Sequence, residues 1–254
     1  MTPLLEAPIL ETRGLTRRFG ALPALSGVSL SVQSGTVLGV IGPNGAGKST
    51  LINLITGHLR PTAGTVLIDG TDLTGAAPWR IAHAGVARTF QIVKPFRGMT
   101  VRENVAISAM YGDIRKATRR AAFELADGVL DRLDLADLAQ RNPAELPIGD
   151  ARRLELARAL AARPRLLLLD EVMAGLRAAE IEAMVALIRA LRDEGVTVLA
   201  VEHVIKAIKA ISDEICVLHH GEVLTRGRPH EVLSDPRVVA AYLGTRYGQR
   251  EGEQ

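Results

Sequence analysis

The sequence predicts an α/β protein in which a helical segment is inserted into a core of buried strands. An apolar, β-branched run at Val37–Ile41 is followed by a glycine-rich loop and then by an apolar segment typical of a helix start. A second run, Leu166–Leu169, is apolar on both faces, as expected of a central parallel strand. From about Val101 to Leu138 the chain is rich in Ala, Arg, Asp and Leu at helical spacing, which predicts the inserted helices.

The loop after the first strand reads Gly42-Pro43-Asn44-Gly45-Ala46-Gly47-Lys48-Ser49-Thr50, the G-x-x-x-x-G-K-[ST] form of a phosphate-binding P-loop. Its glycines allow the backbone to approach an anion closely, and the helix N-terminus behind it favours negative charge. Lys48 is predicted to reach the β- and γ-phosphates, and the Ser49 hydroxyl to bind magnesium. A glycine turn with a surface lysine is the alternative, but the complete pattern between a strand and a helix favours nucleotide binding.

Composition narrows the remaining classes of protein. With 47% hydrophobic and 23% charged residues in 254 positions, the chain can bury a substantial core. Only 3% of residues are aromatic, which argues against binding of single-stranded nucleic acid on stacked rings. The net charge is +3, and the basic pairs are expected mainly as solvated faces, although they suit phosphates, anionic lipid or acidic partner loops: Arg17-Arg18, Arg115-Lys116, Arg119-Arg120 and Arg152-Arg153.

The sequence also predicts where the protein acts. Cys216 is the only cysteine, so no intramolecular disulfide can form, which suits the cytoplasm. It is expected to pack as a small hydrophobe. No signal-peptide pattern is apparent at the N-terminus, and no apolar run approaches the ~20 residues needed to cross a bilayer. We therefore expect membrane association only through a partner.

Further elements follow from local patterns. Strands are expected at Ile9–Leu15, Gly27–Val32, Thr65–Ile68, Val196–Val201, Ile215–Leu218 and Glu222–Leu224. Helices are expected at residues 151–160, as an amphipathic helix, at 178–193, and from Pro229 and Pro236. Phe19, upstream of the P-loop strand, is predicted to stack on adenine, with a packed turn residue as the alternative.

An acidic pair, Asp170-Glu171, directly follows the buried Leu166–Leu169 run. Because ligands of open α/β sheets bind at the carboxyl ends of the strands, this pair is predicted to lie at the phosphate site. Asp170 is then the magnesium ligand and Glu171 the base, the alternative for Glu171 being an ordinary strand-end carboxylate. The later buried strand ends similarly, in Glu202-His203.

From about Leu10 to Gly244 these motifs resemble the ATP-binding subunits of ABC transporters. The order carries the resemblance: the P-loop, Gln91 at the Q-loop position, a signature-like segment from Leu146, Asp170-Glu171 ending the Walker B run, Ala174-Gly175-Leu176 as the D-loop and His203 as the switch histidine. The chain is most similar to the LivG-type ATPases of branched-chain amino acid importers, through Arg88-Thr89-Phe90-Gln91, Met99-Thr100-Val101-x-Glu103-Asn104, Gly149-Asp150-x-Arg152-Arg153-Leu154-Glu155 and Ala241-Tyr242-Leu243-Gly244. Urea-type and lipopolysaccharide-export ATPases share parts of this pattern.

The resemblance implies a P-loop NTPase fold: an ABC ATPase core with a mixed sheet, an N-terminal antiparallel β-subdomain and a helical subdomain at about residues 101–160. It implies one nucleotide-binding domain at residues 8–244 and a polar tail at 245–254, which we expect to be disordered from Gly248 onward. ATP and Mg²⁺ are the implied cofactors. The implied partners are a second ABC ATPase subunit, identical or different, transmembrane permease subunits and, indirectly, a periplasmic or extracellular solute-binding protein, with no nucleic acid. The expected place is the cytoplasmic side of the membrane.

The resemblance also assigns site residues. ATP is expected to contact Phe19, Gly42, Asn44, Gly45, Ala46, Gly47, Lys48, Ser49 and Thr50, and the partner's ATP to contact Gly149. Glu171 is expected to activate water, His203 to bind the γ-phosphate, and Gln91 to sense magnesium and water; Ser49, Gln91 and Asp170 are the expected metal ligands. Taken alone, Gln91 and His203 would more often be a surface amide and a loop histidine.

The sequence departs from the family pattern at the signature, where Leu146-Pro147-Ile148-Gly149-Asp150 stands for the common Leu-Ser-Gly-Gly-Gln. Pro147 has no hydroxyl and no amide hydrogen to donate, and Asp150 could repel phosphate. Val172 and Arg177 replace the usual proline and D-loop Asp or Asn, and the helical segment before Leu146 is shorter than usual. We hypothesise a heterodimer in which this P-loop forms the strong site and this signature the weak one.

Other classes explain less of the sequence. A chromosome-maintenance type of ABC protein needs a long coiled coil between P-loop and signature, and the stretch from Gly42 to Leu146 is too short for one. A translation-factor type usually carries two cassettes in one chain, and here there is one. A P-loop metabolic kinase would not account for Gln91, the signature-like segment and His203 together.

Overall fold

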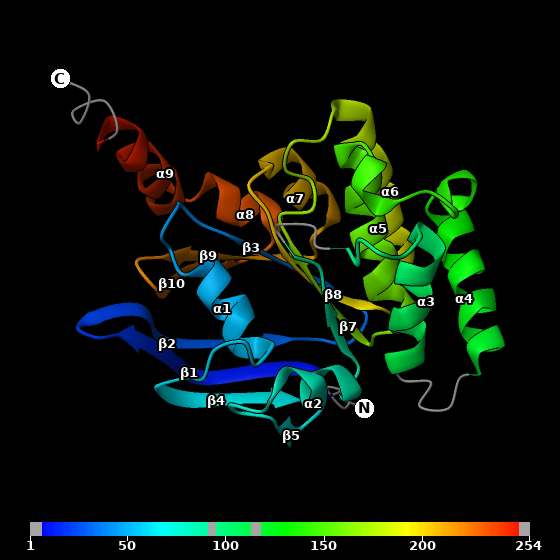
Figure 1. Cartoon of the computed structure of the whole chain (residues 1–254). Coiled ribbons are helices and arrows are strands. Elements are labelled where there is room, and N and C mark those ends of the chain that lie inside the picture. Colours follow the sequence, from blue (N-terminus) through cyan, green and yellow to red (C-terminus); the bar gives the residue numbers. More distant parts are fainter. Residues whose placement is uncertain (1–6, 91–94, 113–117, 249–254) are drawn as a thin grey trace, which may run out of the picture.

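The computed structural model describes residues 7–90, 95–112 and 118–248, with side chains through residue 242. It contains two sheets (Figure 1). The first is antiparallel, in the order β2-β1-β4-β5, and consists of β1 (Leu10–Phe19), β2 (Leu22–Val32), β4 (Ala63–Ile68) and β5 (Thr71–Asp72). The expected N-terminal antiparallel subdomain is confirmed.

The second sheet is mixed, as expected, in the order β10-β9-β3-β8-β7-β6. Its strands are β3 (Val37–Ile41), β6 (Val86–Arg88), β7 (Leu166–Asp170), β8 (Thr197–Val201), β9 (Glu214–His219) and β10 (Glu222–Gly227). β6, β7, β8, β3 and β9 are parallel, and β10 is antiparallel to β9. All residues of β3, β7 and β8 are buried, because both faces of the sheet are covered.

Helix α1 (Lys48–Ile55) lies between the two sheets (Figure 1). Its apolar residues Leu51, Ile52, Leu54 and Ile55 belong to one buried cluster together with residues of both sheets. A second cluster covers the opposite face of the mixed sheet and continues into the inserted helices. The P-loop therefore rests on a strand and a helix that are both embedded in core.

The helical insertion leaves the core after β6 and returns at β7, its neighbour in the sheet. It contains α3 (Val101–Tyr111), α4 (Arg119–Arg132), the 3-10 turns η1 (Ala136–Leu138) and η2 (Pro143–Glu145), and α5 (Ile148–Ala161). Thr100 and Glu103 form a capping box that starts α3. These helices stand beyond the β6 edge of the sheet (Figure 1).

One interpretation of α5 was wrong. The predicted amphipathic helix at residues 151–160 begins earlier, at Ile148, and buries more than one face. Leu154, Glu155 and Leu156 are all buried, because α5 packs against α3, α4 and β6 together. These neighbouring elements bury positions of α5 that the sequence pattern predicted to be exposed to solvent.

The remaining elements are α2 (Pro78–His83), α6 (Ala178–Asp193), α7 (Ile205–Ile211), α8 (Pro229–Ser234) and α9 (Pro236–Gly248). The predicted starts of α6, α8 and α9 are confirmed, whereas α2, α7, β5 and β6 were not predicted. β1 continues beyond the predicted strand end at Leu15 to Phe19, because it pairs with β2 up to that residue. α9 includes the first four residues of the predicted tail, whose remainder lies outside the described residues. None of the described helices is long and apolar enough to cross a membrane.

Candidate active site

The P-loop lies at the edge of the sheet where β3, β7, β8 and β6 all have their carboxyl ends. Glycine is required at two of its positions: a Cβ on Gly42 would lie 2.2 Å from the Leu218 carbonyl oxygen, and one on Gly47 2.6 Å from that of Ala24. Gly47 also has a φ of 102°, in the region that favours glycine. It precedes α1 with no capping side chain among the described residues, so the loop presents the positive end of this helix.

Lys48 is buried, and its Nζ donates to the carbonyl oxygens of Gly42 at 2.6 Å and Pro43 at 3.0 Å. Burial lowers the pKa of this ammonium, while the charges of Glu171 and Asp170 oppose the change. The ammonium therefore lies inside the loop, where an entering phosphate would compete for it with the two carbonyl oxygens.

A cavity of about 320 Å³ joins the loop to the ends of two other strands. Its lining residues are Ala24, Asn44, Gly45, Ala46, Gly47, Lys48, Ser49, Thr50, Glu171 and His203. Glu171 follows β7 and His203 follows β8, so three sequence-distant segments meet here. Most of the predicted site residues are thus brought together; Gly42 lies buried beneath the loop.

Glu171 is held in an unusual conformation. Its φ of 54° is uncommon for a residue with a side chain, and its amide donates to the Val201 carbonyl oxygen at 2.9 Å. Its Oε1 lies 2.5 Å from Nε2 of His203. Backbone strain of this kind persists only where the surrounding structure fixes it, here through β8.

Asp170 is buried and paired with Arg88, whose Nη2 donates to Oδ2 at 3.0 Å. The Asp170 amide donates to the Thr89 hydroxyl at 3.1 Å. Burial raises the pKa of Asp170, and the Arg88 charge opposes this rise. Carboxylate and hydroxyl oxygens are ligands that Mg²⁺ prefers, so Asp170 and the exposed Ser49 fit that ion.

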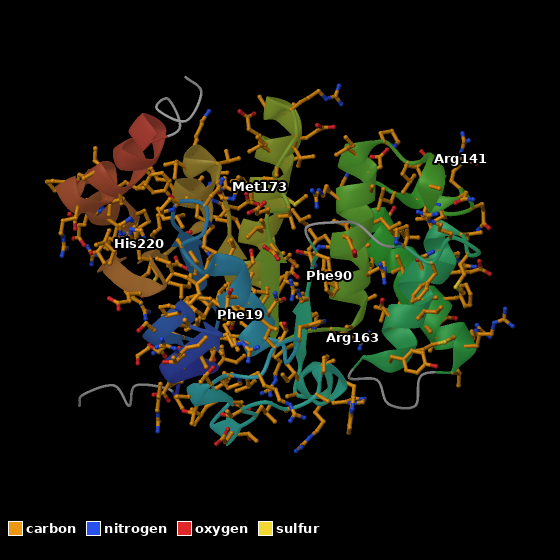
Figure 2. The ribbon with its side chains drawn as sticks, turned by 60° about the vertical axis from the view of Figure 1, so that its left-hand side comes forward. Phe19, Phe90, Arg141, Arg163, Met173 and His220 are labelled. Atoms are coloured by element: carbon orange, nitrogen blue, oxygen red, sulfur yellow. The ribbon has the colours of Figure 1, made fainter. Side chains whose placement is uncertain are left out.

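Glu202 was named only as a strand end, yet it is fully buried beside the site. Its Oε1 accepts from the amide of Met173 at 2.8 Å, and its Oε2 has no hydrogen-bond partner among the described residues. Burial raises its pKa to about 7, against the effect of the Met173 and His203 amides. Met173 belongs to the segment after Glu171 (Figure 2), so Glu202 links that segment to the end of β8.

Sequence reasoning missed the roles of Arg88 and Glu202 near the site. Arg88 was used only as part of a family motif. Their positions in the sequence could have indicated these roles, because Arg88 ends β6 and Glu202 directly follows β8, at the sheet edge that carries the P-loop. A charged residue at that place is a candidate for the site even without a motif.

The signature-like segment lies elsewhere. Gly149, in the first turn of α5, is outside the P-loop cavity as the described residues define it, and a Cβ on it would lie 2.6 Å from Oε1 of Glu180. Asp150 accepts from Nη2 of Arg153 at 2.6 Å, so its charge has a partner. Pro147 precedes the helix without a capping side-chain hydrogen bond among the described residues.

Phe19, which the sequence predicted to stack on adenine, is not joined to the cavity. Phe19 is 46% exposed at the end of β1, outside the lining that the described residues form, and the Arg17 guanidinium lies 4.7 Å from its ring centroid. Gln91 lies outside the described residues, so its assigned roles remain predictions.

A P-loop, two carboxylates and a histidine at the carboxyl ends of neighbouring parallel strands define a P-loop nucleoside triphosphatase. A family profile described as ABC transporter matches residues 25–174, and one described as branched-chain amino acid ATP-binding cassette transporter matches residues 222–248. The chain belongs to the ABC transporter ATP-binding family, and it is an ATPase of that family.

Individual relatives agree over nearly the whole chain. The high-affinity branched-chain amino acid transport ATP-binding protein BraF of Pseudomonas aeruginosa is 42% identical over 253 residues, covering 94% of this chain and 99% of its own. LivG of Escherichia coli is 39% identical with the same coverage. A crystal structure of an ABC transporter cassette in its ADP conformation matches with a TM-score of 0.82 and 34% identity, over 93% of this chain and 99% of that one.

Proposed function

We propose that this chain is the ATP-hydrolysing subunit of an importer for branched-chain amino acids. Two observations support that solute: BraF and LivG, named for branched-chain amino acid transport, match 94% of the chain, and residues 222–248 match the corresponding C-terminal family. Both favour it over urea uptake or lipopolysaccharide export. Relatives named as transport proteins likewise favour it over a non-transport nucleotide-gated protein.

The contact between Glu171 and His203 carries the proposed chemistry. A carboxylate at the edge of the P-loop cavity, held by an imidazole, can orient a water molecule and accept its proton. His203 can then turn its Nε2 toward a phosphate oxygen, and Lys48 supplies positive charge at the loop. The reaction depends on positioning and charge neutralisation rather than on a covalent intermediate.

We further propose that Ser49, Asp170 and Gln91 hold Mg²⁺. When bound, that ion would neutralise charge on the β- and γ-phosphates. Arg88 favours the ionised form of Asp170, because the guanidinium opposes the rise in the Asp170 pKa that burial causes. Phe19 is proposed to contact adenine, which requires its ring to approach the nucleotide from the end of β1.

A second cassette is the proposed partner at the nucleotide. Gly149 does not line this chain's own P-loop cavity as the described residues define it. We infer that it contacts ATP held by the other subunit. A related cassette, 26% identical, has a dimeric structure bound to ADP and phosphate. The missing hydroxyl at Pro147 supports the hypothesis that the site formed by this signature is the weaker of the two.

The permease is the proposed partner on another face. A groove of about 380 Å³ separates α2 and β6 from α3 and α5, and Trp79 and Tyr111 on its lining are 64% and 76% exposed. Exposed aromatic side chains at a groove are typical of protein interfaces. We propose that a cytoplasmic segment of the permease binds here, which would hold the chain at the cytoplasmic side of the membrane, with the solute-binding protein reached through the permease.

Uptake by the assembled transporter tests the solute. Proteoliposomes containing this chain, its neighbouring cassette, permease and binding protein are expected to accumulate labelled leucine when ATP is enclosed with the cassettes. Urea accumulation without leucine would overturn the proposed solute and leave the ATPase assignment intact. Trp79→Ala tests the groove, because it should weaken co-purification with the permease while leaving ATP binding unchanged.

A further inference from the structure

Arg88 is the last residue of β6, at the point where the chain leaves the core for the helical insertion. Its side chain is only 9% exposed. Burying a guanidinium is unfavourable unless hydrogen bonds replace its water, so its partners define what it does.

On the side of the core, three side-chain oxygens accept hydrogen bonds from the guanidinium. Nη2 donates to Oδ2 of Asp170 at 3.0 Å, and Nη1 donates to Oδ1 of Asn53 at 2.7 Å and to the Thr56 hydroxyl at 3.1 Å. Asn53 belongs to α1 and Thr56 caps it, so one planar group joins the P-loop helix to the proposed metal carboxylate.

On the other side, the guanidinium lies against the groove proposed for the permease. Its central carbon is 4.6 Å from the centroid of the Phe90 ring, and Phe90 contacts His58 edge-to-face at 5.7 Å. Arg88, Phe90, His58 and Thr56 all line the groove. Figure 2 shows Phe90 between the core and the inserted helices.

The geometry couples these two sides mechanically. The fork of an arginine is rigid and planar, so the face that stacks on Phe90 and the edge that holds Asp170 move together. A group in the groove that displaces Phe90 must tilt the guanidinium or lose the stacking contact. A tilt alters the hydrogen bond to Asp170, which neighbours Glu171 in the chain, and loss of the stacking contact removes one of the groups that fix the orientation of the guanidinium.

We propose that Arg88 is a positioning residue that couples the Asp170 carboxylate to occupancy of the groove by the permease. The proposal rests on the proposed function for the identity of the metal and of the groove's occupant. Because coupling between two sites is reciprocal, magnesium at Asp170 also changes how the groove binds its partner. No proton transfer or covalent step is assigned to Arg88.

The first test measures ADP binding by the isolated protein, with Mg²⁺ and with EDTA, using titration calorimetry. ADP avoids hydrolysis, and the ratio of the two dissociation constants reports the contribution of Mg²⁺ alone. Arg88→Gln is expected to reduce that ratio by about tenfold while the affinity in EDTA changes by less than about twofold. Arg88→Lys is expected to fall between, because an ammonium keeps the charge but not the fork.

Arg165→Gln is the matched control. Arg165 precedes β7 and forms an exposed ion pair with Asp69 at 2.7 Å, remote from the P-loop cavity. It should leave the ratio unchanged. Failure of the wild-type protein to bind ADP both with Mg²⁺ and with EDTA would contradict the proposed nucleotide site itself, which is a different outcome from failure of the coupling.

The second test changes a residue that lines the groove, and it remains informative if Arg88→Gln does not fold. Phe90→Leu is expected to lower the Mg²⁺ ratio in the same direction by about threefold, and to lower the stimulation of ATP hydrolysis by the permease by a similar factor. An unchanged ratio in Phe90→Leu and in the folded Arg88 variants would overturn the proposal. So would an equal loss of affinity with and without Mg²⁺, which indicates a purely structural role.

Discussion

Oε1 of Glu171 lies 2.5 Å from Nε2 of His203, although 32 positions separate them in the sequence. The contact exists because β7 and β8 are adjacent parallel strands that end at the same edge. It also requires the left-handed backbone at Glu171, which turns the chain after β7.

Backbone strain at Glu171 predicts an unusual order of stabilities. Glu171→Gly and Glu171→Ala both remove the carboxylate and differ only by a Cβ. Because φ at this position is 54°, the glycine variant is expected to be more stable than the alanine variant by about 1 kcal/mol, measured by urea unfolding. Neither should hydrolyse ATP at an appreciable rate. An alanine variant of equal or greater stability would indicate that no strain is stored there.

Glu202 predicts a pH dependence of stability. Its pKa is raised from 4.5 to about 7, so the native state binds the proton more tightly than the unfolded chain does. This contribution is therefore fully present below about pH 4.5 and is lost as pH rises toward about 7, a change of up to about 3 kcal/mol. Glu202→Gln cannot titrate, so the stability of wild type relative to this variant should fall between about pH 4.5 and about pH 7.

Urea unfolding of both proteins at several pH values measures that difference, and other titrating groups cancel between them. A difference that stays constant across this range would mean that Glu202 is ionised throughout. The Met173 amide should remain bonded in the variant, because the Gln side chain keeps one carbonyl oxygen.

Arg177 occupies the N-cap position of α6, where Asn and Asp are favoured. Its amide donates to Oε2 of Glu180 at 2.8 Å, which supplies only half of a capping box. Arg177→Asn adds a capping oxygen and is expected to raise the thermal unfolding midpoint by about 2 °C. Arg177→Ala, which removes the arginine without adding a cap, is the control and should not raise it.

Pro147 tests the idea of unequal ATP sites. Pro147→Ser restores a hydroxyl worth one charge-assisted hydrogen bond, about 1.5–3 kcal/mol, so within the assembled transporter ATP hydrolysis at the site that this signature completes should rise by about tenfold or more. Ile148→Ala, at the neighbouring exposed position, is the control for general disturbance of the segment. An unaltered rate in the serine variant would remove the hypothesis of a weak site.

The sequence predicted the P-loop and the acidic pair because each depends on a local pattern, whereas the mixed sheet was implied by the family resemblance. Gly42 and Gly47 are recognisable since no other residue fits there, and β7 is recognisable since both its faces are apolar. The contact of Arg88 with Asp170 could not be predicted, because these residues are 82 positions apart and meet only through the pairing of β6 with β7.

The burial of charged side chains could not be predicted from the sequence either. Glu202 looks like an ordinary acidic residue at a strand end, and only the packing around it raises its pKa. Glu155 was likewise part of a helix expected to have one wet face, until α3, α4 and β6 enclosed it. Elements as short as β6 and α7 contain too few residues for a periodic pattern.

The most direct test of the account is ATP hydrolysis by the cassette assembled with its neighbouring cassette and permease, compared for the wild type and Glu171→Gln. We expect hydrolysis to appear on assembly and to fall by at least about 100-fold in the variant, with ATP binding retained, because the amide cannot accept a proton from water. Hydrolysis at the wild-type rate in the folded, ATP-binding variant would contradict the assignment of Glu171 as the base.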